Sequence, residues 1–417
     1  MSSRTQVISD VQAKTEDLKS SNNAKDVVDL DDLRKAIPAH CWKPSYLISF
    51  SYLFRDLALA GSAMALAYTY IPQVENQWVR YALWALYGYV QGLFMTGIWV
   101  LGHECGHMAF SPSTLLNNTL GFILHSLLLT PYFSWQSSHR RHHIYANNLS
   151  KDHNYVPPQR SEYLASLIVE IKKVEELTED SPIVIIIRIL IQQIFGFPWY
   201  LATNITASEG SLHGPQSKAV LGNSHFLPTS TLFRPEEAHL ILLSDLGLAA
   251  TAFCLWYTGT LIGFSTMALL YIQPYMWVNH WIVAITYLHH THPSLPKYEA
   301  EAWTFLRGAT ATIDRDFGWI GRHLMHNIIE YHVIHHLFSK IPFYYGEEAT
   351  NAVIPLLGDD YHVDRTNPFL PGIWESFTKC QWVEPDDASK EAKDRIMWYK
   401  AGPVPPPETS MGIKKWL

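Results

Sequence analysis

Apolar and polar residues alternate along this chain in long blocks rather than at single positions. Four apolar blocks are long enough for helices that cross about 30 Å of hydrocarbon, which takes about 20 residues. They cover about residues 49–73, 81–101, 240–258 and 261–287. Short linkers join the first block to the second and the third to the fourth, so we expect two helical hairpins. The pattern predicts an all-α integral membrane protein with four transmembrane helices.

Two other apolar blocks are predicted to lie in the membrane interface, or to re-enter the membrane, instead of crossing it. Residues 119–133 are few for a span and include His125 and Pro131. Residues 182–201 include Arg188 and two glutamines. Short length and polar residues of this kind are typical of interfacial segments.

Polar sequence flanks the apolar blocks. Residues 1–30 are expected to be a disordered tail, and no secretory signal peptide is visible in them. Residues 31–48 are predicted to be an N-terminal cytosolic or interfacial segment, with a short helix that Pro38 ends. We expect one domain over 49–400, followed by a C-terminal tail over 401–417.

Composition excludes several classes of protein. Hydrophobic residues make up 48% of the chain and charged residues only 17%, which is low for a soluble protein. The formal net charge of −7 argues against a nucleic-acid partner. The four cysteines lie far apart and form neither a CxxC pair nor a disulfide framework.

Histidine is the residue type that points to chemistry. The chain contains 21 histidines, and 15 of them fall within 103–143 and 280–336. On a helix, positions i, i+3 and i+4 share one face, so suitably spaced histidines direct their imidazoles to one point. Three clusters, the first, second and third histidine boxes, have this spacing: His103-Glu-Cys-Gly-His107, His139-Arg-Arg-His142-His143 and His332-Val-Ile-His335-His336.

Eight converging imidazoles indicate metal binding, because buried imidazoles without partners are unfavourable and repel one another when protonated. Imidazole suits Zn, Cu, Fe and Ni. Eight ligands are too many for one tetrahedral zinc, but they suit two ions of higher coordination number with positions open for dioxygen. We therefore predict a two-metal site and choose iron, although these residues alone do not separate iron from other metals that imidazole binds.

The boxes also constrain the topology. The first box comes directly after 81–101, so it emerges at one face of the membrane. All three boxes must lie on that face to share ions. Residues 119–133 and 182–201 then cannot cross, while the hairpin 240–287 crosses twice. Both termini fall on the same side as the boxes, which we predict to be cytosolic.

The motifs together resemble those of membrane fatty acid desaturases, and most closely those of the oleate Δ12 (omega-6) acyl-lipid group. The resemblance extends over about residues 30–400. It implies O2-dependent desaturation of an unactivated acyl chain, with oleoyl lipid converted to linoleoyl lipid. The motifs are AIPAHCW near residue 37, HECGH, HRRHH, ITYLHHTHPSLPKY, TIDRDFG and HVIHHLFSKIPFY.

The resemblance further implies a cytosolic helical cap that holds a di-iron centre with all eight box histidines. It adds one ligand after the fourth transmembrane helix, and His290 occupies that place, with His292 and His289 as weaker candidates. For His326 and His323 a role behind the ligands is as plausible as ligation. Carboxylates that could orient ligating imidazoles are Glu104, Asp152, Asp314, Asp316 and Glu330.

The resemblance also implies an external electron donor, cytochrome b5 with its reductase, since the chain has no His-Pro-Gly-Gly haem motif. The Arg140-Arg141 pair could face this donor, or could simply be solvated or face phosphate. Lys414-Lys415 resembles a dilysine retrieval signal, so we expect an endoplasmic reticulum membrane protein with both termini cytosolic. The sequons that start at Asn117, Asn148 and Asn204 are predicted to be unused.

Several alternatives stay open. Met108 and Lys297 stand where histidines are common in plant relatives, and relatives with the same boxes include omega-3 (Δ15) desaturases, acetylenases, conjugases and hydroxylases. HECGH also matches the H-E-x-x-H signature of zinc proteases, with Glu104 as the base. A non-enzymatic metal transporter is a third class, which would need more polar residues within the membrane helices. Neither of the last two classes explains the two H-x-x-H-H triples.

Overall fold

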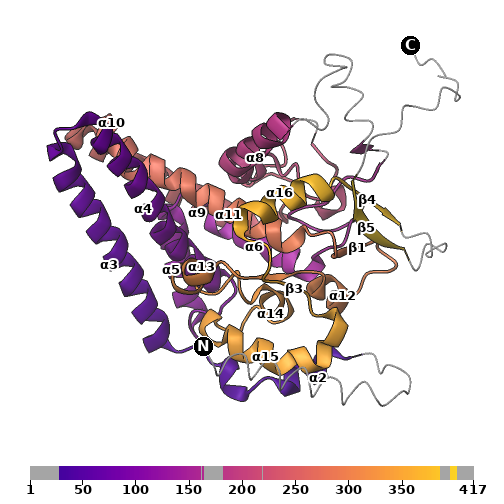
Figure 1. The fold of residues 1–417 in the computed structure, drawn as a ribbon. Helices are drawn as coiled ribbons and strands as arrows, with labels where there is room; N and C mark the ends of the chain where they lie inside the picture. The colour runs from indigo at the N-terminus through magenta and orange to yellow at the C-terminus, as the bar shows by residue number, and fades with distance from the viewer. Residues whose placement is uncertain (1–27, 161, 164–181, 218, 386–394, 402–417) are drawn as a thin grey trace, which may run out of the picture.

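The computed structural model describes residues 28–160, 162–163, 182–217, 219–385 and 395–401. The predicted N-terminal tail up to residue 27 and the C-terminal tail from residue 402, with its dilysine sequence, lie outside the described residues. The described chain is mostly helical, with long helices that extend away from a region of shorter elements (Figure 1). The long helices are α3 (Tyr46–Tyr70), α4 (Gln77–Gly106), α8 (Pro182–Thr203), α9 (Ala238–Ile262) and α11 (Gln273–His290).

The four segments predicted as membrane spans form two helical hairpins. The 3-10 turn η2 (Ile71–Gln73) connects α3 to α4, which contain 25 and 30 residues and so extend ~37 Å and ~45 Å. The second hairpin runs from α9 through α10 (Phe264–Met267) and the π-helical turn η5 (Ala268–Ile272) into α11. The hairpins pack together, and the Tyr87 hydroxyl of α4 donates to the Leu270 carbonyl at 2.8 Å.

The fourth predicted span, 261–287, is interrupted rather than a single regular helix. Pro274 has no backbone N–H, and its ring clashes with the carbonyl four residues earlier, so α-helical hydrogen bonds cannot continue through it. The π turn η5 directly precedes α11 and accommodates this break. On the facing α4, Gly92 permits close approach, because a Cβ there would lie 2.3 Å from the Trp277 Cβ.

Length and hydropathy would let two helices in the described part of the chain cross a membrane, namely Pro182–Thr203 and Pro235–Ile262. The second is α9 together with the 3-10 turn η4 (Pro235–Glu237). The first is α8, which was predicted to lie in the interface, so its composition alone permits either arrangement. Helices α3, α4 and α11 are less apolar on average. Several large apolar side chains of α3 and α4 are nevertheless exposed: Leu47, Phe54, Leu66, Trp78 and Leu86.

The segment 119–133 does not form one helix. It is divided between α5 (Thr114–Leu127) and α6 (Tyr132–Tyr145), and Pro131 is the N-cap of α6. With 14 residues, α5 is only ~21 Å long, which is less than the hydrocarbon thickness. This length agrees with the prediction that the segment does not cross.

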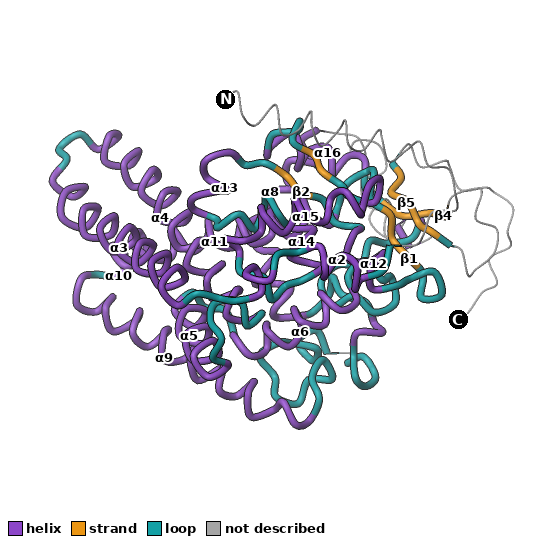
Figure 2. Tube along the Cα trace, turned by 90° about the horizontal axis from the view of Figure 1, so that it is seen from below, coloured by secondary structure: helices purple, strands orange, loops and turns teal. Residues whose placement is uncertain are grey.

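Two small sheets join segments that are distant in the sequence. An antiparallel sheet has the order β1-β5-β4, and a two-stranded parallel sheet pairs β2 with β3 (Figure 2). The prediction of an all-α chain was wrong in this respect, because strands of two to five residues are too short to show an alternating pattern. The strands are β1 (Pro296–Tyr298), β2 (Asp314–Arg315), β3 (Val363–Asp364), β4 (Trp382–Pro385) and β5 (Ile396–Lys400).

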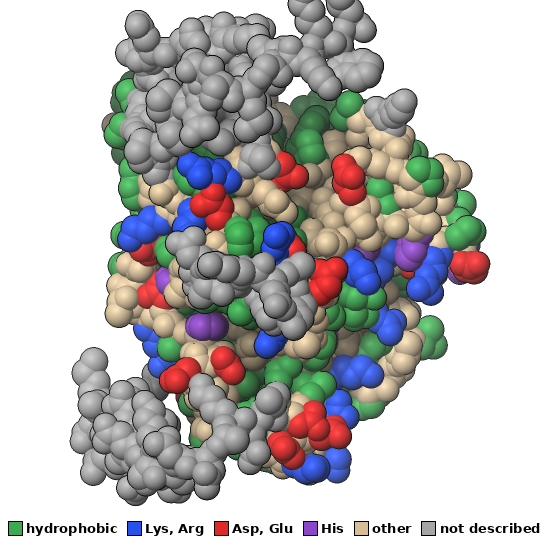
Figure 3. Space-filling model, turned by 90° about the vertical axis from the view of Figure 1, so that its right-hand side faces the viewer, with side chains coloured by type: hydrophobic (Ala, Val, Ile, Leu, Met, Phe, Trp, Pro, Cys, Tyr) green, Lys and Arg blue, Asp and Glu red, His purple; other side chains and the backbone are tan. Residues whose placement is uncertain are grey.

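Short helices form a region around the third histidine box and complete the described fold. Its core joins Leu33 and Cys41 of the N-terminal segment to Val333 and Leu337 of the third box helix and to Val353. Acidic and basic side chains are interspersed on the face that Figure 3 shows. The helices are α2 (Leu30–Ala36), η1 (Ala39–Trp42), η3 (Glu209–Ser211), α12 (Phe305–Thr310), α13 (Gly318–Leu324), α14 (His332–Leu337), η6 (Phe343–Tyr345), α15 (Gly346–Leu357), η7 (Gly358–Asp360) and α16 (Phe369–Lys379).

Candidate metal centre

Four helices bring the predicted ligands together. The first box lies in the last turn of α4, with His107 as its C-cap, so this helix carries its histidines beyond the predicted span. The second box lies in α6, the third box forms most of α14, and His290 is the last residue of α11. All nine histidines predicted as ligands therefore project from helix ends or short helices that meet at one place.

These histidines form two neighbouring groups that could each hold a metal ion. Within each group the candidate ligand atoms lie within 4.8 Å of one another. His332 lies outside both groups, but its Nε2 is 3.4 Å from the Nε2 of His290. The groups adjoin, because the rings of His143 and His336 stack with centroids 4.1 Å apart. The five-histidine group is His103, His107, His139, His143 and His335, and the three-histidine group is His142, His290 and His336.

The donor atoms fit metal ions. The Nε2 atoms of His103 and His139 face each other at 3.0 Å, and the buried Nε2 of His335 has no hydrogen-bond partner. Burial and the neighbouring imidazoles lower the pKa values of His139, His143, His335 and His336 well below their ordinary range. These rings are therefore neutral and keep the lone pairs that a metal requires.

Asp152 lies directly behind a predicted ligand. His142 Nδ1 donates to Asp152 Oδ1 at 2.7 Å, which leaves His142 Nε2 facing the centre. The carboxylate also accepts the backbone N–H groups of Asn147 and Asn154, each at 2.9 Å. Burial opposes ionisation of Asp152, but His142, the Asn154 N–H and the charge of Lys297 hold its pKa below the ordinary value. A carboxylate in this place fixes the orientation of the imidazole and increases its basicity.

Two other carboxylates named from the sequence support box residues in different ways. Glu104 Oε1 lies 3.5 Å from His103 Nδ1, and Glu104 Oε2 accepts the Phe343 N–H at 3.1 Å. Asp314 accepts the Val333 N–H at 2.8 Å, so its carboxylate lies at the N-terminus of α14. Glu104 therefore touches a predicted ligand, whereas Asp314 supports the helix that carries the third box.

Two histidines predicted as additional ligands or supporting residues lie away from both groups. His292 Nδ1 hydrogen-bonds Ser294 Oγ at 2.7 Å, and its side chain belongs to a separate cluster with Asp364 and Glu375. His326 Nε2 donates to Asp56 Oδ2 at 2.7 Å. Neither imidazole belongs to either histidine group, and each has a polar partner of its own, so a ligand or supporting role for these two residues stays a prediction.

The remaining candidates are also placed by the structure. His289 donates to the Ile313 carbonyl at 2.5 Å and stacks on His332, so it lies behind the centre. His323 packs its ring against Trp319. Asp316 pairs with Arg322, and Glu330 accepts the Phe317 N–H, so neither carboxylate orients a ligand.

Sequence reasoning missed the aromatic support beneath the five-histidine group. The fully buried His125 of α5 stacks on Trp99 at 5.0 Å between centroids and donates to the Trp99 carbonyl at 3.0 Å. Trp135 stacks on His139 at 4.5 Å. A histidine inside an apolar segment was the available signal, but no local pattern pointed to the two tryptophans beside it.

An apolar cavity lies beside both groups. Its lining includes His139 of the five-histidine group and His142 of the three-histidine group. The other walls are largely aromatic and aliphatic side chains from α4, α6, α8 and α11. They are Trp99, Trp135, Phe197, Tyr200 and Ile282, with Thr286 and Asn154 as polar members.

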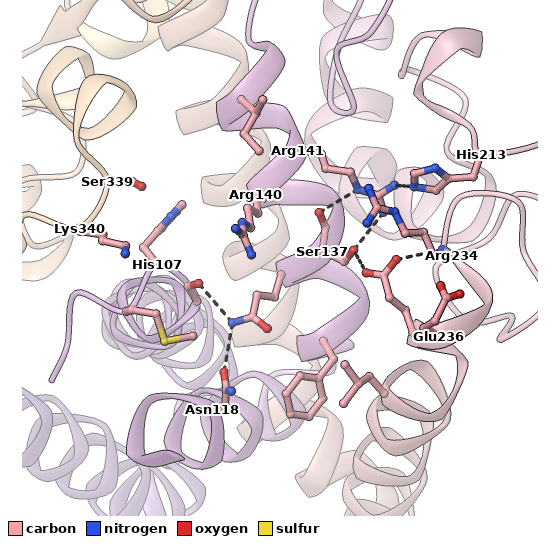
Figure 4. Close-up of a pocket in the computed structure, with 17 residues that line it drawn as sticks. His107, Asn118, Ser137, Arg140, Arg141, His213, Arg234, Glu236, Ser339 and Lys340 are labelled. Atoms are coloured by element: carbon pink, nitrogen blue, oxygen red, sulfur yellow. Dashed lines mark hydrogen bonds between the residues drawn. The ribbon is translucent and has the colours of Figure 1, made fainter. Parts of the chain in front are cut away.

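A larger cavity of about 840 Å³ includes His107 in its lining. Arg140 and Lys340 approach it from one side, and Arg141 and His213 from the other (Figure 4). The guanidinium of Arg141 is already hydrogen-bonded within the protein, because it donates to the Ser137 carbonyl at 3.2 Å and to His213. Arg140 is exposed and has no hydrogen bond or ion pair within the described ranges, so the two arginines have different environments.

Comparison with known proteins identifies the family. A sequence model described as fatty acid desaturase matches residues 76–367, more than half of the chain. The chain belongs to the fatty acid desaturase family. The resemblance inferred from the motifs is thus confirmed, and the chain is an oxidoreductase that acts on a lipid acyl substrate with an external electron donor. Family membership leaves no place for the zinc-protease and transporter hypotheses.

Three relatives with printed names match most of this chain. The chain is 40% identical over 383 residues to an oleate hydroxylase of Claviceps purpurea, with coverage of 89% of this chain and 80% of the relative. It is 42% identical over 362 residues to a Delta(12) fatty acid desaturase of Mortierella alpina, with coverage of 85% and 88%. It is 40% identical over 388 residues to a Delta(12)-fatty-acid desaturase of Arabidopsis thaliana, with coverage of 93% and 95%.

Proposed function

We propose that this desaturase introduces the Δ12 double bond into oleoyl lipid and so produces linoleoyl lipid, a step of unsaturated fatty acid biosynthesis. The observation that carries the proposal is the pair of adjoining histidine groups in a chain about 40% identical to Δ12 desaturases. Such a centre suits removal of two hydrogens from an unactivated chain, because side chains alone supply no group strong enough to do so.

The two histidine groups would hold two iron ions (Fe2+/Fe3+), with His332 adjoining the three-histidine group. Bound iron supplies the redox chemistry that uses O2 as co-substrate. The protein supplies neutral imidazoles, the carboxylate of Asp152 that orients His142, and the contact of Glu104 with His103. These contacts fix the donor geometry before substrate enters.

The apolar cavity beside His139 and His142 would receive the reacting methylenes. Trp99, Trp135 and Phe197 provide aromatic walls that exclude water from a reactive centre. His139 and His142 belong to different groups, so a chain in this cavity would lie next to both ions. The direction in which the chain passes this point would then determine which bond is oxidised.

The same proposal gives the chain four membrane spans, α3, α4, α9 and α10–α11, with the boxes and both termini in the cytosol of the endoplasmic reticulum. Helix α8 would lie in the interface. Its exposed Ile183, Ile187 and Leu190 follow helical spacing along one face, while its Phe197 and Leu201 are buried.

Cysteine labelling tests this topology. Cys254 is the exposed cysteine of the described chain, so a C254S variant removes the accessible native thiol that would otherwise be labelled. In sealed microsomes, K340C on the cap should react with a membrane-impermeant maleimide, and E75C between α3 and α4 should react only after permeabilisation. Equal reaction at both positions would contradict the hairpin. The three sequons do not test it, because Asn117, Asn148 and Asn204 are all buried.

The external donor is proposed to be cytochrome b5, supplied by its reductase. Arg140 and Lys340 are exposed cations at the cavity beside His107, and they would meet an acidic protein surface there. Exchange of Arg140 for Gln should slow donor-dependent turnover most at low ionic strength, and the difference from wild type should shrink as salt is added.

Oleate hydroxylation is the second candidate, because an oleate hydroxylase is among the relatives at 40% identity. Expression in a eukaryotic host that makes oleate but no dienes, followed by gas chromatography–mass spectrometry, separates the candidates. A 9,12-diene supports the proposal. A hydroxy acid with no diene replaces it, and a product formed only from added linoleate indicates an omega-3 enzyme, acetylenase or conjugase.

A further inference from the structure

Lys297 is a buried cation close to the metal centre. It lies in β1, seven residues after His290, and its side chain is 1% exposed. Burial of an ammonium group is unfavourable unless hydrogen bonds and opposite charge compensate for the lost water. Its Nζ donates to the His290 carbonyl at 2.8 Å and to the side-chain oxygen of Asn147, and it lies 5.6 Å from the ring centre of Tyr399.

These contacts close a ring that includes two predicted ligands. From Lys297 the ring passes to Asn147, whose backbone N–H donates to Asp152. Asp152 accepts from His142 Nδ1, and His142 Nε2 lies 3.3 Å from His290 Nε2. The His290 carbonyl then leads back to Lys297. The ring thus joins the loop after α6 to the end of α11.

The side-chain amide of Asn147 is oriented so that its oxygen, and not its nitrogen, faces Lys297. Its side-chain amide donates to the carbonyls of Gly308 at 2.8 Å and Ala311 at 2.9 Å. Its φ of 62° lies in the left-handed region, which asparagine tolerates better than most residues. The side-chain oxygen is therefore fixed in place as an acceptor for the ammonium group.

The position of Lys297 also suits the end of α11. His290 is the last residue of this helix, so its carbonyl has no partner within the helix and lies at the negative end of the helix dipole. A cation there stabilises the last turn. This turn carries His290, whose imidazole belongs to the three-histidine group.

We propose that Lys297 is a positioning residue for the three-histidine group, where it fixes His290 and His142 relative to each other by closing this ring. The inference rests on the proposed metal centre and extends it to a residue that ligates nothing. None of the five histidines of the other group belongs to the ring. Loss of Lys297 should therefore weaken one ion selectively.

Metal titration of the full-length protein tests the proposal without reference to activity. Metal-free protein is titrated with Fe2+ under anaerobic conditions, and ions per chain are counted by native mass spectrometry. Wild type should bind two ions. In K297M the first ion should bind as in wild type, and the second about 10–100-fold more weakly, the range for loss of a partner behind a ligand.

Lys400 provides the matched control, because it is an exposed lysine in β5 of the same sheet. K400M should bind both ions as wild type does. N147G is the second variant if K297M does not accumulate, since glycine keeps the left-handed backbone and its N–H but removes the acceptor for Lys297. It should weaken the second ion in the same way.

Each other result has a defined meaning. If K297M or N147G binds both ions as tightly as K400M, the proposal is overturned. Equal weakening of both ions, together with a lower thermal midpoint, also overturns it, because Lys297 would then act on general stability. Failure of the wild type itself to bind two ions would refute the proposed metal centre, and that outcome is visible before any variant is examined.

Discussion

The two histidine groups are built differently, although they adjoin. The five-histidine group takes all its members from box positions on α4, α6 and α14, and none of its imidazoles donates to Asp152. The three-histidine group takes one histidine from each of α6, α11 and α14 and depends on contacts of Asp152, Asn147 and Lys297. Helix periodicity places the members of the first group on one face of each helix, whereas the second also has hydrogen bonds that link distant segments behind its ligands.

The largest effect is expected when a ligand of the five-histidine group is lost. H335A should lower desaturation more than about 100-fold, because it removes a buried Nε2 whose lone pair would bind an ion. This loss exceeds the about 10–100-fold range for residues that only orient a ligand. The protein should still accumulate, since the other seven histidines of the two groups remain. Product per chain, from gas chromatography and immunoblotting, measures this. Near-normal activity would mean that His335 binds no ion.

A smaller loss is expected when only the orientation of a ligand is disturbed. D152N keeps the size of the side chain but removes the charge that His142 donates to, so activity should fall about 10–100-fold. E104Q is the comparison in the five-histidine group, where the contact with His103 is longer, 3.5 Å, and its effect should be smaller. The reverse order would contradict the difference between the groups.

The metal-free protein should lose stability as pH falls. The pKa values of His139, His143, His335 and His336 are lowered in the folded chain, so below about pH 6.5 the unfolded chain binds more protons. Each such group then costs about 1.4 kcal/mol per pH unit. Thermal unfolding between pH 8 and 5 measures this. Bound metal should oppose protonation, and a flat profile of the metal-free protein would exclude buried neutral rings.

The smallest effect is expected at His292. H292A should leave activity close to that of wild type, because its imidazole bonds Ser294 and lies in a cluster with Asp364 and Glu375 rather than at the centre. H290A, two residues earlier, should lose activity on the scale of H335A. Iron content of both variants provides the check. A larger loss in H292A than in H290A would mean that His292, not His290, completes the site.

The histidine boxes and the two helical hairpins could be predicted from the sequence. The spacing of His103 and His107 and of the two H-x-x-H-H triples places each set on one helix face, whatever the surroundings. The two hairpins followed from block lengths and short linkers. The short strands and the role of Asp314 at the start of α14 had no comparable local pattern.

By itself, the sequence therefore determined the desaturase family, the box histidines and the paired long helices, because each depends on residue type and local periodicity. Only the tertiary structure separated the ligands into two groups, placed His292 and His326 outside them, and brought Lys297 and Asn147 behind His290 and His142. The reason is physical: contacts between residues 150 positions apart depend on how helix ends meet, and no short window of sequence contains that information.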